Sequence, residues 1–462
     1  MAFFLLIGII VIFLVSYKFL DKDFLSPVNL YLLFSTFSIA AMFLFYEEWN
    51  LNEYGAFSAG VYMTGSIFFV LGCGIAKVAM SRNIYQREIE SEQNIAPTRF
   101  DISMIKIIIM IIVCFAALYG TYTYMRRLGN SSLIAIGQAI QNYRYMKGQG
   151  LLTGEESKGS IWNLFSYFSI AFAYCSIFVL IKNAVNNNFK VKDLLLLIPF
   201  ILRSIEYLFQ SNRGGIIQLF FGAVMSWFVS MKFKKGWNRK INSKVVKIVI
   251  RVIVILVPIF FGSLILIGRY DTLKGFDFKN YSLVYFSGGI RNLDQFLKEP
   301  TFEPQMFGEE TFVQLHRNLY ISYGIGKDLV RYLEFRKING RNIGNIYTSY
   351  RRFYHDFGFL GVCLFPLIQG IIISLMYYKL NRNPRNDKIN YLEVIYCYLS
   401  YTTMYIAIDD LFYSSWVSIT GVKILIIMFV AYFFMFNITS KQPGLIRVDL
   451  GKFKISDRRK SI

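Results

Sequence analysis

Eleven apolar stretches constrain the fold of this chain of 462 residues more than any other feature. A transmembrane helix needs about 20 mostly apolar residues, and within lipid the backbone of such a stretch has to satisfy its own hydrogen bonds. Hydrophobic residues make up 55% of the chain, which overrides the several soluble domains that its length alone would suggest. We therefore expect an all-α, polytopic membrane protein with helices at residues 2–20, 27–46, 57–79, 102–124, 161–181, 193–211, 214–231, 245–268, 358–378, 390–408 and 416–437.

The positions of Lys and Arg predict the orientation in the membrane. The connections after the first, third, fifth, seventh and ninth stretches are basic, as is the C-terminal tail, so these parts are expected in the cytoplasm. The short connections 47–55, 211–213 and 409–415 contain Arg213 as their only basic residue, so they are expected outside, together with the N-terminus. The first stretch has neither a basic start nor a small-residue cleavage site, so we expect it to remain as a helix.

Charge and cysteine content narrow the class of protein. The net charge of +21 requires no nucleic acid, because the bias toward basic cytoplasmic segments accounts for most of it and the tail can lie on anionic lipid. All five cysteines lie within apolar stretches, which excludes a disulfide framework in the exterior loops. With two histidines and no HExxH pattern, we expect no transition-metal site and no cofactor. A divalent ion held by carboxylates and phosphates stays open.

The chain divides into helices one to eight (1–268), an exterior segment (269–357), helices nine to eleven (358–437) and a basic cytoplasmic tail (438–462). The exterior segment has apolar residues at helical spacing, so we expect short helices that cap the bundle. It contains thirteen Lys or Arg against ten Asp or Glu, although positive charge is normally avoided outside, and this favours an anionic ligand. A shorter exterior segment, 125–160, is expected to hold a helix on the membrane face.

The stretch "NIYTSYRRFYHDFGFLG", residues 345–361, places charges directly before an apolar stretch. We expect a helix over 347–357 that ends at Gly358. Residues four apart share a face of such a helix, which groups Tyr347 with Arg351 and His355, and Thr348 with Arg352 and Asp356. Either Arg352 and Asp356 form a structural pair while Arg351 and His355 face a ligand, or the roles are reversed, or the charges only snorkel to the interface.

A second charged stretch is "RSIEYLFQSNRGG", residues 203–215. Arg203 and Glu206 lie three residues apart inside an apolar stretch, where an ionisable pair is either functional or neutralises itself against a neighbouring helix. Arg213 lacks an acidic neighbour in the sequence, and the glycines that follow it allow close approach of a ligand. We therefore expect Arg213 to bind a ligand.

Several arginines at the outer interface suit a lipid-linked pyrophosphate, because guanidinium donates two parallel hydrogen bonds to a phosphoanion and keeps its charge. The candidate ligands of the pyrophosphate are Arg213, Arg351, Arg291 and Arg269. If pyrophosphate is the leaving group, arginines that bind it more tightly as its charge develops would accelerate the reaction. The acceptor hydroxyl then needs a base, and the candidates are Asp356, His316 and Asp294.

Taken in order, "SNRGGIIQLFF" (211–221), "GRY" (268–270), "YSLVYFSGGIRNLDQFL" (281–297) and the 345–361 stretch resemble the Wzy-type polymerases of bacterial O-antigen and capsular polysaccharide. The last motif of that family has an Asn, Tyr and Thr run, then Arg, then Asp-Phe-Gly and a further Gly. The residues of this chain that fit it are Asn345, Tyr347, Thr348, Arg351, Asp356, Phe357, Gly358 and Gly361. The resemblance is best over about 200–380, and the family has no obligatory residue where Arg352 and His355 stand.

The resemblance implies a membrane-embedded glycosyltransferase of the GT-C type at the outer side of the bacterial plasma membrane. Such an enzyme transfers a growing glycan from undecaprenyl pyrophosphate onto the next lipid-linked repeat unit, and works beside a flippase and a chain-length regulator of the same pathway. Arg213 and Arg351 match the functional arginines of the family best, and Arg269 and Arg291 match more loosely. The alternatives are an O-antigen ligase, a flippase for lipid-linked oligosaccharides, or a structural partner in an export complex.

Overall fold

The computed structural model describes most of the membrane-embedded part of the chain. It describes residues 1–81, 99–129, 136–148, 159–237, 278–300, 303–327, 329, 333–382, 389–436, 438–442 and 445–448. Over these ranges the chain is almost wholly α-helical, as the sequence predicts. The predicted span at 245–268 and the candidate Arg269 lie outside the described residues.

Eight described helices are long and apolar enough to cross a membrane, so the chain is a membrane-embedded protein. They are α1 (Ala2–Phe19), α2 (Pro27–Met42, prolonged by the 3-10 turn Phe43–Phe45), α3 (Ala56–Ser81), α4 (Met104–Gly129), α6 (Ser160–Val185), α8 (Arg213–Lys235), α13 (Ser349–Arg382) and α16 (Ile419–Phe436). Their order along the chain follows eight of the eleven predicted stretches.

Two further predicted spans are helical but interrupted. Residues 193–211 contain the end of a 3-10 helix, Val191–Leu196, and then α7 (Leu197–Phe209). Residues 390–408 contain α14 (Tyr391–Leu399) and α15 (Tyr401–Tyr405), which Ser400 separates. The hydroxyls of Thr402 and Thr403 donate back to carbonyls three residues earlier, and hydroxyls that bond to the nearby backbone in this way compete with helical hydrogen bonding.

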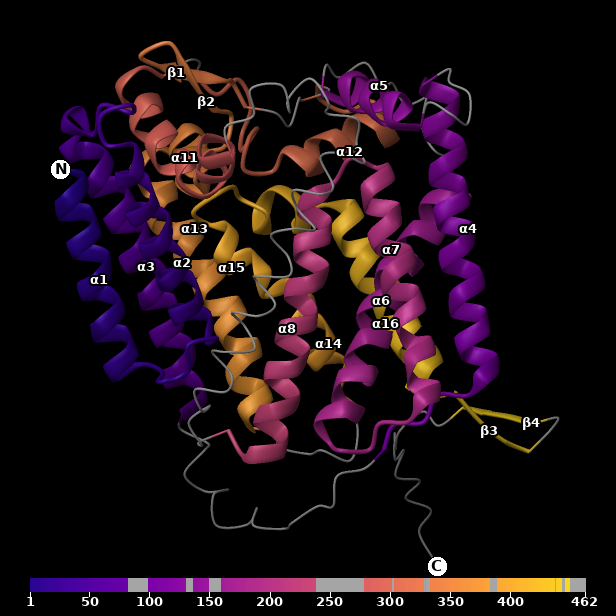
Figure 1. The fold of residues 1–462 in the computed structure, drawn as a ribbon. Helices are drawn as coiled ribbons and strands as arrows, with labels where there is room; N and C mark the ends of the chain where they lie inside the picture. The colour runs from indigo at the N-terminus through magenta and orange to yellow at the C-terminus, as the bar shows by residue number, and fades with distance from the viewer. Residues whose placement is uncertain are drawn as a thin grey trace, which may run out of the picture.

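The remaining elements lie mostly at one end of the bundle (Figure 1). They are α5 (Ile136–Gly148), α11 (Phe278–Lys298), α12 (Val313–Tyr323), and the hairpin of β1 (Arg336–Ile338) with β2 (Arg341–Gly344). The start of α1 lies at the same end, which we call the outer end, and α16 finishes at the other, inner end. A 3-10 turn, Leu51–Glu53, a π-helical turn, Phe412–Trp416, and the strands β3 (Ile438–Gln442) and β4 (Leu445–Val448) complete the list.

The outer elements include a hairpin that the sequence analysis did not predict. Its two strands pair antiparallel across Asn339 and Gly340, which both have positive φ angles of 49° and 74°. Asn-Gly between two short strands is the usual signal for such a turn, because these residues adopt left-handed backbone conformations most readily. The signal was therefore present in the sequence.

Contacts between α3 and α13 position the candidate site. A side chain at Gly72 would meet the carbonyl oxygen of Leu367 at 2.2 Å, and one at Gly370 would meet the carbonyl oxygen of Phe69 at 2.4 Å. Small residues of this kind let the backbones of membrane helices approach closely. Toward the outer end, Gly65 of α3 makes room for the ring of Tyr350. The start of α13 is thereby held against a neighbouring span.

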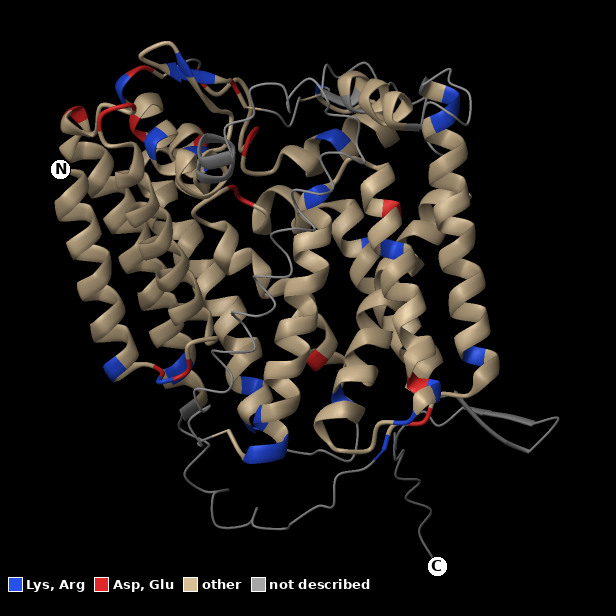
Figure 2. Cartoon of the chain, in the orientation of Figure 1, with Lys and Arg blue, Asp and Glu red and all other residues tan. Residues whose placement is uncertain are grey.

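The charged side chains lie mainly at the two ends of the bundle (Figure 2). Two ion pairs are exceptions and lie buried among the helices. Lys182 of α6 pairs with Glu393 of α14 at 2.9 Å, and Arg203 pairs with Glu206, both on α7, at 2.6 Å. The second pair forms as the self-neutralising alternative expected, and Glu206 also accepts a hydrogen bond from Thr121 of the neighbouring α4.

Candidate functional site

The candidate site lies at the outer end of α13, where the 345–361 motif begins the helix. The backbone N–H of Ser349 donates to the carbonyl of Ile406 at 2.8 Å, and its hydroxyl donates to the carbonyl of Asp409 at 3.1 Å. Tyr350 shares a hydrogen bond of 2.6 Å with Tyr31 of α2. These contacts fix the first turn of α13 and therefore the directions of the charged side chains that follow.

Gly358 ends this outer part of α13, as the sequence predicts. Its backbone angles, φ 59° and ψ −151°, are not helical, so α13 consists of an outer segment and a membrane-spanning segment with a kink between them. Glycine is the residue that adopts this conformation without steric strain. The outer segment, 349–357, carries the arginines, the histidine and the aspartate of the motif.

Arg351 is completely buried in the outer segment. Its guanidinium forms ion pairs with Glu310 and with Glu334, the latter at 2.9 Å. It also stacks on the rings of Phe296, at 4.5 Å, and Tyr347, at 4.9 Å. Carboxylates and aromatic faces together offset the cost of removing a guanidinium from water. Its Nε atom has no hydrogen-bond acceptor within the described part of the chain.

Arg352 does not form the pair with Asp356 that one sequence alternative proposed. Its Nε donates to the Asp409 carboxylate at 2.8 Å, and Nη1 donates to the Glu310 carbonyl at 3.3 Å. Asp409 lies far along the chain, between α15 and the π-helical turn, so no local spacing pointed to it. Arg352 therefore links the start of α13 to the exterior connection that follows α15.

Asp356 holds the segment that leads into α12. Its carboxylate accepts hydrogen bonds from the backbone N–H of Thr311, at 2.6 Å, and of Glu310, at 3.1 Å. The Nδ1 atom of His355 lies 3.0 Å from the same carboxylate. Three donors thus occupy Asp356, the residue that sequence analysis put forward as the base.

Arg291 and Asp294 form a buried ion pair on α11. Arg291 also donates through Nε to the carbonyl of Trp49 at 2.8 Å, while Asp294 accepts from the backbone N–H of Gly55 at 2.8 Å and pairs with Lys298 at 3.1 Å. Burial lowers the pKa of Arg291, and Asp294 opposes that shift. This geometry ties α11 to the connection between α2 and α3, so both residues are fully engaged within the protein.

Arg213 is the first residue of α8, and it lies apart from Arg351. It donates to the hydroxyl of Tyr285 on α11 at 3.0 Å and stacks on the same ring at 5.6 Å. Arg351 contacts α11 at Phe296, eleven residues later, which corresponds to about 16 Å along the helix axis. The two arginines therefore contact α11 about three helical turns apart.

His316, the second candidate base, lies on α12. Its Nε2 atom is 3.0 Å from the carbonyl oxygen of Phe307. No hydrogen bond or ion pair joins it to Arg351 or Asp356 among the described contacts. Within the described ranges, no group of three or more His, Cys, Asp or Glu side chains is placed to hold a metal ion.

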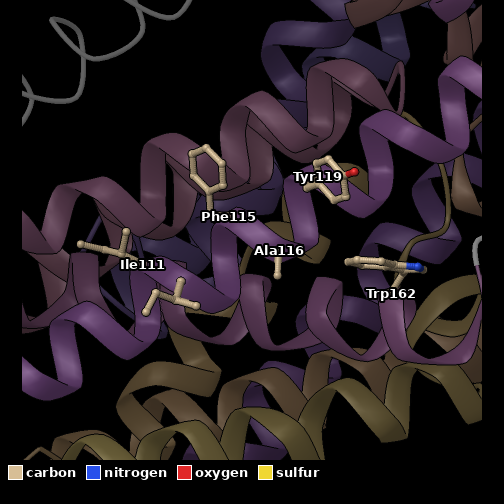
Figure 3. A pocket seen from close by; sticks show the side chains of 6 residues that line it. Ile111, Phe115, Ala116, Tyr119 and Trp162 are labelled. Atoms are coloured by element: carbon tan, nitrogen blue, oxygen red, sulfur yellow. The ribbon is translucent and has the colours of Figure 1, made fainter.

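An apolar groove lies away from the charged site, between α4 and the start of α6 (Figure 3). It has a volume of about 400 Å³ and is lined by Ile111, Ile112, Phe115, Ala116, Tyr119 and Trp162. Trp162 packs against Gly120 of α4, where a side chain would collide with its ring. Phe115 and Tyr119 are more than half exposed, so this face of α4 is suited to hydrocarbon and not to a charged substrate.

Comparisons with protein-family models, curated protein sequences and solved structures find no match to this chain. The functional assignment therefore depends on the residues at the outer end. Of the sequence candidates, the structure places Arg351 and His355 against the same ring, that of Phe296. Asp356 lies beside Nδ1 of His355. The other described candidates contact different parts of the structure, and these are Arg213, Arg291 and His316. Sequence analysis missed the roles of Glu310, Glu334 and Asp409, because their contacts to α13 are distant in the chain.

Proposed function

We propose that this chain is a Wzy-type polymerase that joins lipid-linked oligosaccharide repeat units at the outer side of the bacterial plasma membrane. The order of the motifs over residues 211–361 supports the family. The observation that carries the proposal is the outer segment of α13, where a buried arginine and a histidine share one face at the end of a membrane helix. A lipid-linked pyrophosphate presents its charge at this depth, while its lipid stays in the bilayer.

In this proposal Arg351 binds the pyrophosphate of the donor lipid. Glu310 and Glu334 now neutralise Arg351, and both belong to the exterior segment that caps the bundle. The pyrophosphate takes their place, so binding requires the two carboxylates to withdraw. Because pyrophosphate gains charge as it leaves, Arg351 stabilises the transition state more than the ground state.

Arg213 suits a second pyrophosphate. A polymerase of this type brings together two lipid-linked substrates, the donor and the acceptor, and each carries its own pyrophosphate. The two arginines contact α11 at positions about 16 Å apart along its axis, which supports a separate pyrophosphate at each. We therefore assign Arg351 to the donor and Arg213 to the acceptor.

The direct test is transfer by the purified protein in liposomes that contain undecaprenyl-pyrophosphate-linked repeat units. A polymerase yields a ladder of longer lipid-linked glycans on a gel. A ligase yields no ladder but transfers glycan to a different lipid acceptor, and a flippase moves the lipid across the bilayer without forming a bond. Absence of the ladder with intact, folded protein and complete substrate would refute the polymerase assignment.

Two companion measurements test the arrangement. Arg213→Lys keeps the charge but loses the planar fork, so we expect transfer to fall about tenfold or more, since a hydrogen bond to a charged group contributes about 1.5 to 3 kcal/mol. In cells, cysteines introduced at positions 236 and 305 report the orientation. Labelling of position 305 and not 236 by an impermeant reagent is expected for an outer exterior segment, and the reverse pattern contradicts it.

A further inference from the structure

His355 lies one helical turn after Arg351, and both side chains contact the ring of Phe296 on α11. The His355 and Phe296 ring centres are 6.1 Å apart, and the His355 side chain is only 1% exposed. Its Nδ1 atom is 3.0 Å from the Asp356 carboxylate. A carboxylate at Nδ1 selects the tautomer with the proton on that nitrogen, which leaves Nε2 with a free lone pair.

The two ring nitrogens of His355 differ in their surroundings. Nδ1 faces Asp356, whereas Nε2 has no hydrogen-bond partner among the described residues. The nearest carboxylate to Nε2 is that of Glu309, at 3.9 Å, which is beyond hydrogen-bond distance. A buried imidazole nitrogen without a partner is uncommon, because buried polar atoms are normally satisfied. A general base needs such a free nitrogen, because its lone pair has to accept the proton of the substrate.

The Asp356 carboxylate, unlike Nε2 of His355, has hydrogen-bond partners within the protein. Its oxygens accept hydrogen bonds from Thr311 and Glu310 as well as from His355. These three donors take most of the roughly four acceptor positions of a carboxylate, so Asp356 is already engaged within the protein. Asp356 therefore orients His355 and secures the segment before α12.

We propose that His355 is the general base of the transfer reaction and that Asp356 is its positioning residue. This inference rests on the proposed function. The acceptor hydroxyl gives its proton to Nε2 of His355 while its oxygen forms a bond to the anomeric carbon of the donor sugar. The bond from that carbon to the pyrophosphate oxygen breaks, and its electron pair leaves with the pyrophosphate held by Arg351. Protonated His355 then returns the proton to water.

The segment just before α12 faces both His355 and Arg351. The charged groups that face His355 are Glu309 and Glu310, from the segment before α12, together with Asp356 on its own helix. Glu310 also pairs with Arg351. Displacement of these two glutamate side chains, together with that of Glu334, therefore exposes the phosphate-binding guanidinium and the base, while the backbone of the segment stays bound to Asp356. Substrate binding is thereby coupled to the uncovering of Nε2.

The test uses His355→Asn in the full-length protein in liposomes. The amide nitrogen of Asn takes roughly the position of Nδ1, so the hydrogen bond to Asp356 can persist while the base is lost. We expect kcat for transfer to fall by about 100-fold or more, as for a positioned general base, with KM within about threefold of wild type. The matched control is His316→Asn, at the other histidine of the chain. Its kcat is expected to exceed that of His355→Asn by about 100-fold.

A His355→Gly variant distinguishes a base from a residue that only supports the fold, because added imidazole can replace a missing base. Added imidazole is expected to restore transfer in this variant at least tenfold, and to have no such effect on wild type. Asp356→Asn is expected to lower kcat tenfold or more with KM unchanged. Should the Asn variant fail to accumulate, His355→Gln enters the same assay.

The outcomes separate this inference from the proposed function. If wild-type protein forms no ladder, the polymerase assignment fails. If wild type forms the ladder while the folded His355 variants retain kcat within about threefold, His355 is not the base. Loss of kcat in His316→Asn with normal His355 variants would assign the base to His316 and overturn the inference in the same way.

Discussion

Carboxylates contact α13 at both of its ends, but their partners differ. At the inner end, Tyr377 donates to Asp23 at 3.0 Å, Tyr378 donates to Asp21, and Lys232 of α8 pairs with Asp23 at 2.6 Å. Each of these contacts joins α13 or α8 to the connection between α1 and α2. We call this group the inner clasp.

The outer end holds more charge and satisfies it less completely. Five carboxylates surround Arg351, Arg352 and His355 there, namely Glu309, Glu310, Glu334, Asp356 and Asp409. Within the described residues, Nε of Arg351 still lacks a hydrogen-bond acceptor and Nε2 of His355 still lacks a donor. A group that only stabilises the fold gains nothing from such gaps. In the function that we propose, the inner clasp serves stability and the outer end keeps these donors and acceptors for a substrate.

The largest expected effect is that of Arg351→Gln. Loss of the guanidinium leaves the partly buried Glu310 without its arginine and leaves Glu334 with Arg336 alone, which we expect to cost about 3 kcal/mol of unfolding free energy. Transfer is expected to be abolished as well. Thermal unfolding in detergent measures the first effect. Arg341→Gln, which removes an exposed ion pair with Glu48 at 3.8 Å, is the control and should change stability by less than about 1 kcal/mol.

Asp23→Asn should separate stability from activity. The substitution removes the ion pair with Lys232 and weakens the acceptor for Tyr377, so we expect a loss of about 1.5 to 3 kcal/mol. Transfer by the folded variant should stay within about threefold of wild type. If transfer is lost while the unfolding temperature is unchanged, the inner clasp has a functional role and the comparison breaks down. Lys22→Gln, at an exposed neighbour, is the control.

Gly358→Ala tests the kink that separates the two ends. No atom lies within 4 Å of the added methyl group, so only the backbone conformation opposes the change. We expect a loss of about 2 kcal/mol. Gly60→Ala in α3 also points into open space but has a helical backbone, so it should be neutral or stabilising. Equal effects of the two substitutions would contradict the special conformation at Gly358.

The smallest effect concerns pH at the inner clasp. Burial raises the pKa of the Asp21 carboxyl to about 6. The folded protein therefore binds this proton more tightly than the unfolded chain, whose carboxyl has a pKa of about 4. The stabilisation is complete below about pH 4 and is lost as the pH rises through 6. Since Asp21 is partly exposed, we expect only about 1 kcal/mol. Asp21→Asn should abolish this part of the pH dependence, and an unchanged profile would contradict it.

The sequence predicted the parts of the structure that depend on local spacing. The apolar stretches that the structure describes are helical, Gly358 interrupts α13, and Arg351 and His355 share a face because they are four residues apart. The Arg203 and Glu206 pair follows from the same rule. In each case the neighbours along one helix determine the contact.

Contacts between distant segments were not predictable from one sequence. The partners of Arg351, at Glu310 and Glu334, come from the exterior segment, and the partner of Arg352 is Asp409, 57 residues away. Nothing in the composition of those segments distinguishes these acidic residues from exposed ones. The hydrogen bonds from the segment before α12 to Asp356 were missed for a related reason, because they depend on where that segment folds back.

The close contact between α3 and α13 also has a consequence for how the protein is made. Gly72 and Gly370 lie on helices that are synthesised far apart in time, because 298 residues separate them. At about 5 to 20 residues per second, translation of that interval takes roughly 15 to 60 s. During this time α3 is already in the membrane without its partner, and its small-residue face is open to lipid or to other helices. The outer end of the protein can therefore assemble only late, when α13 has left the ribosome and packs against α3.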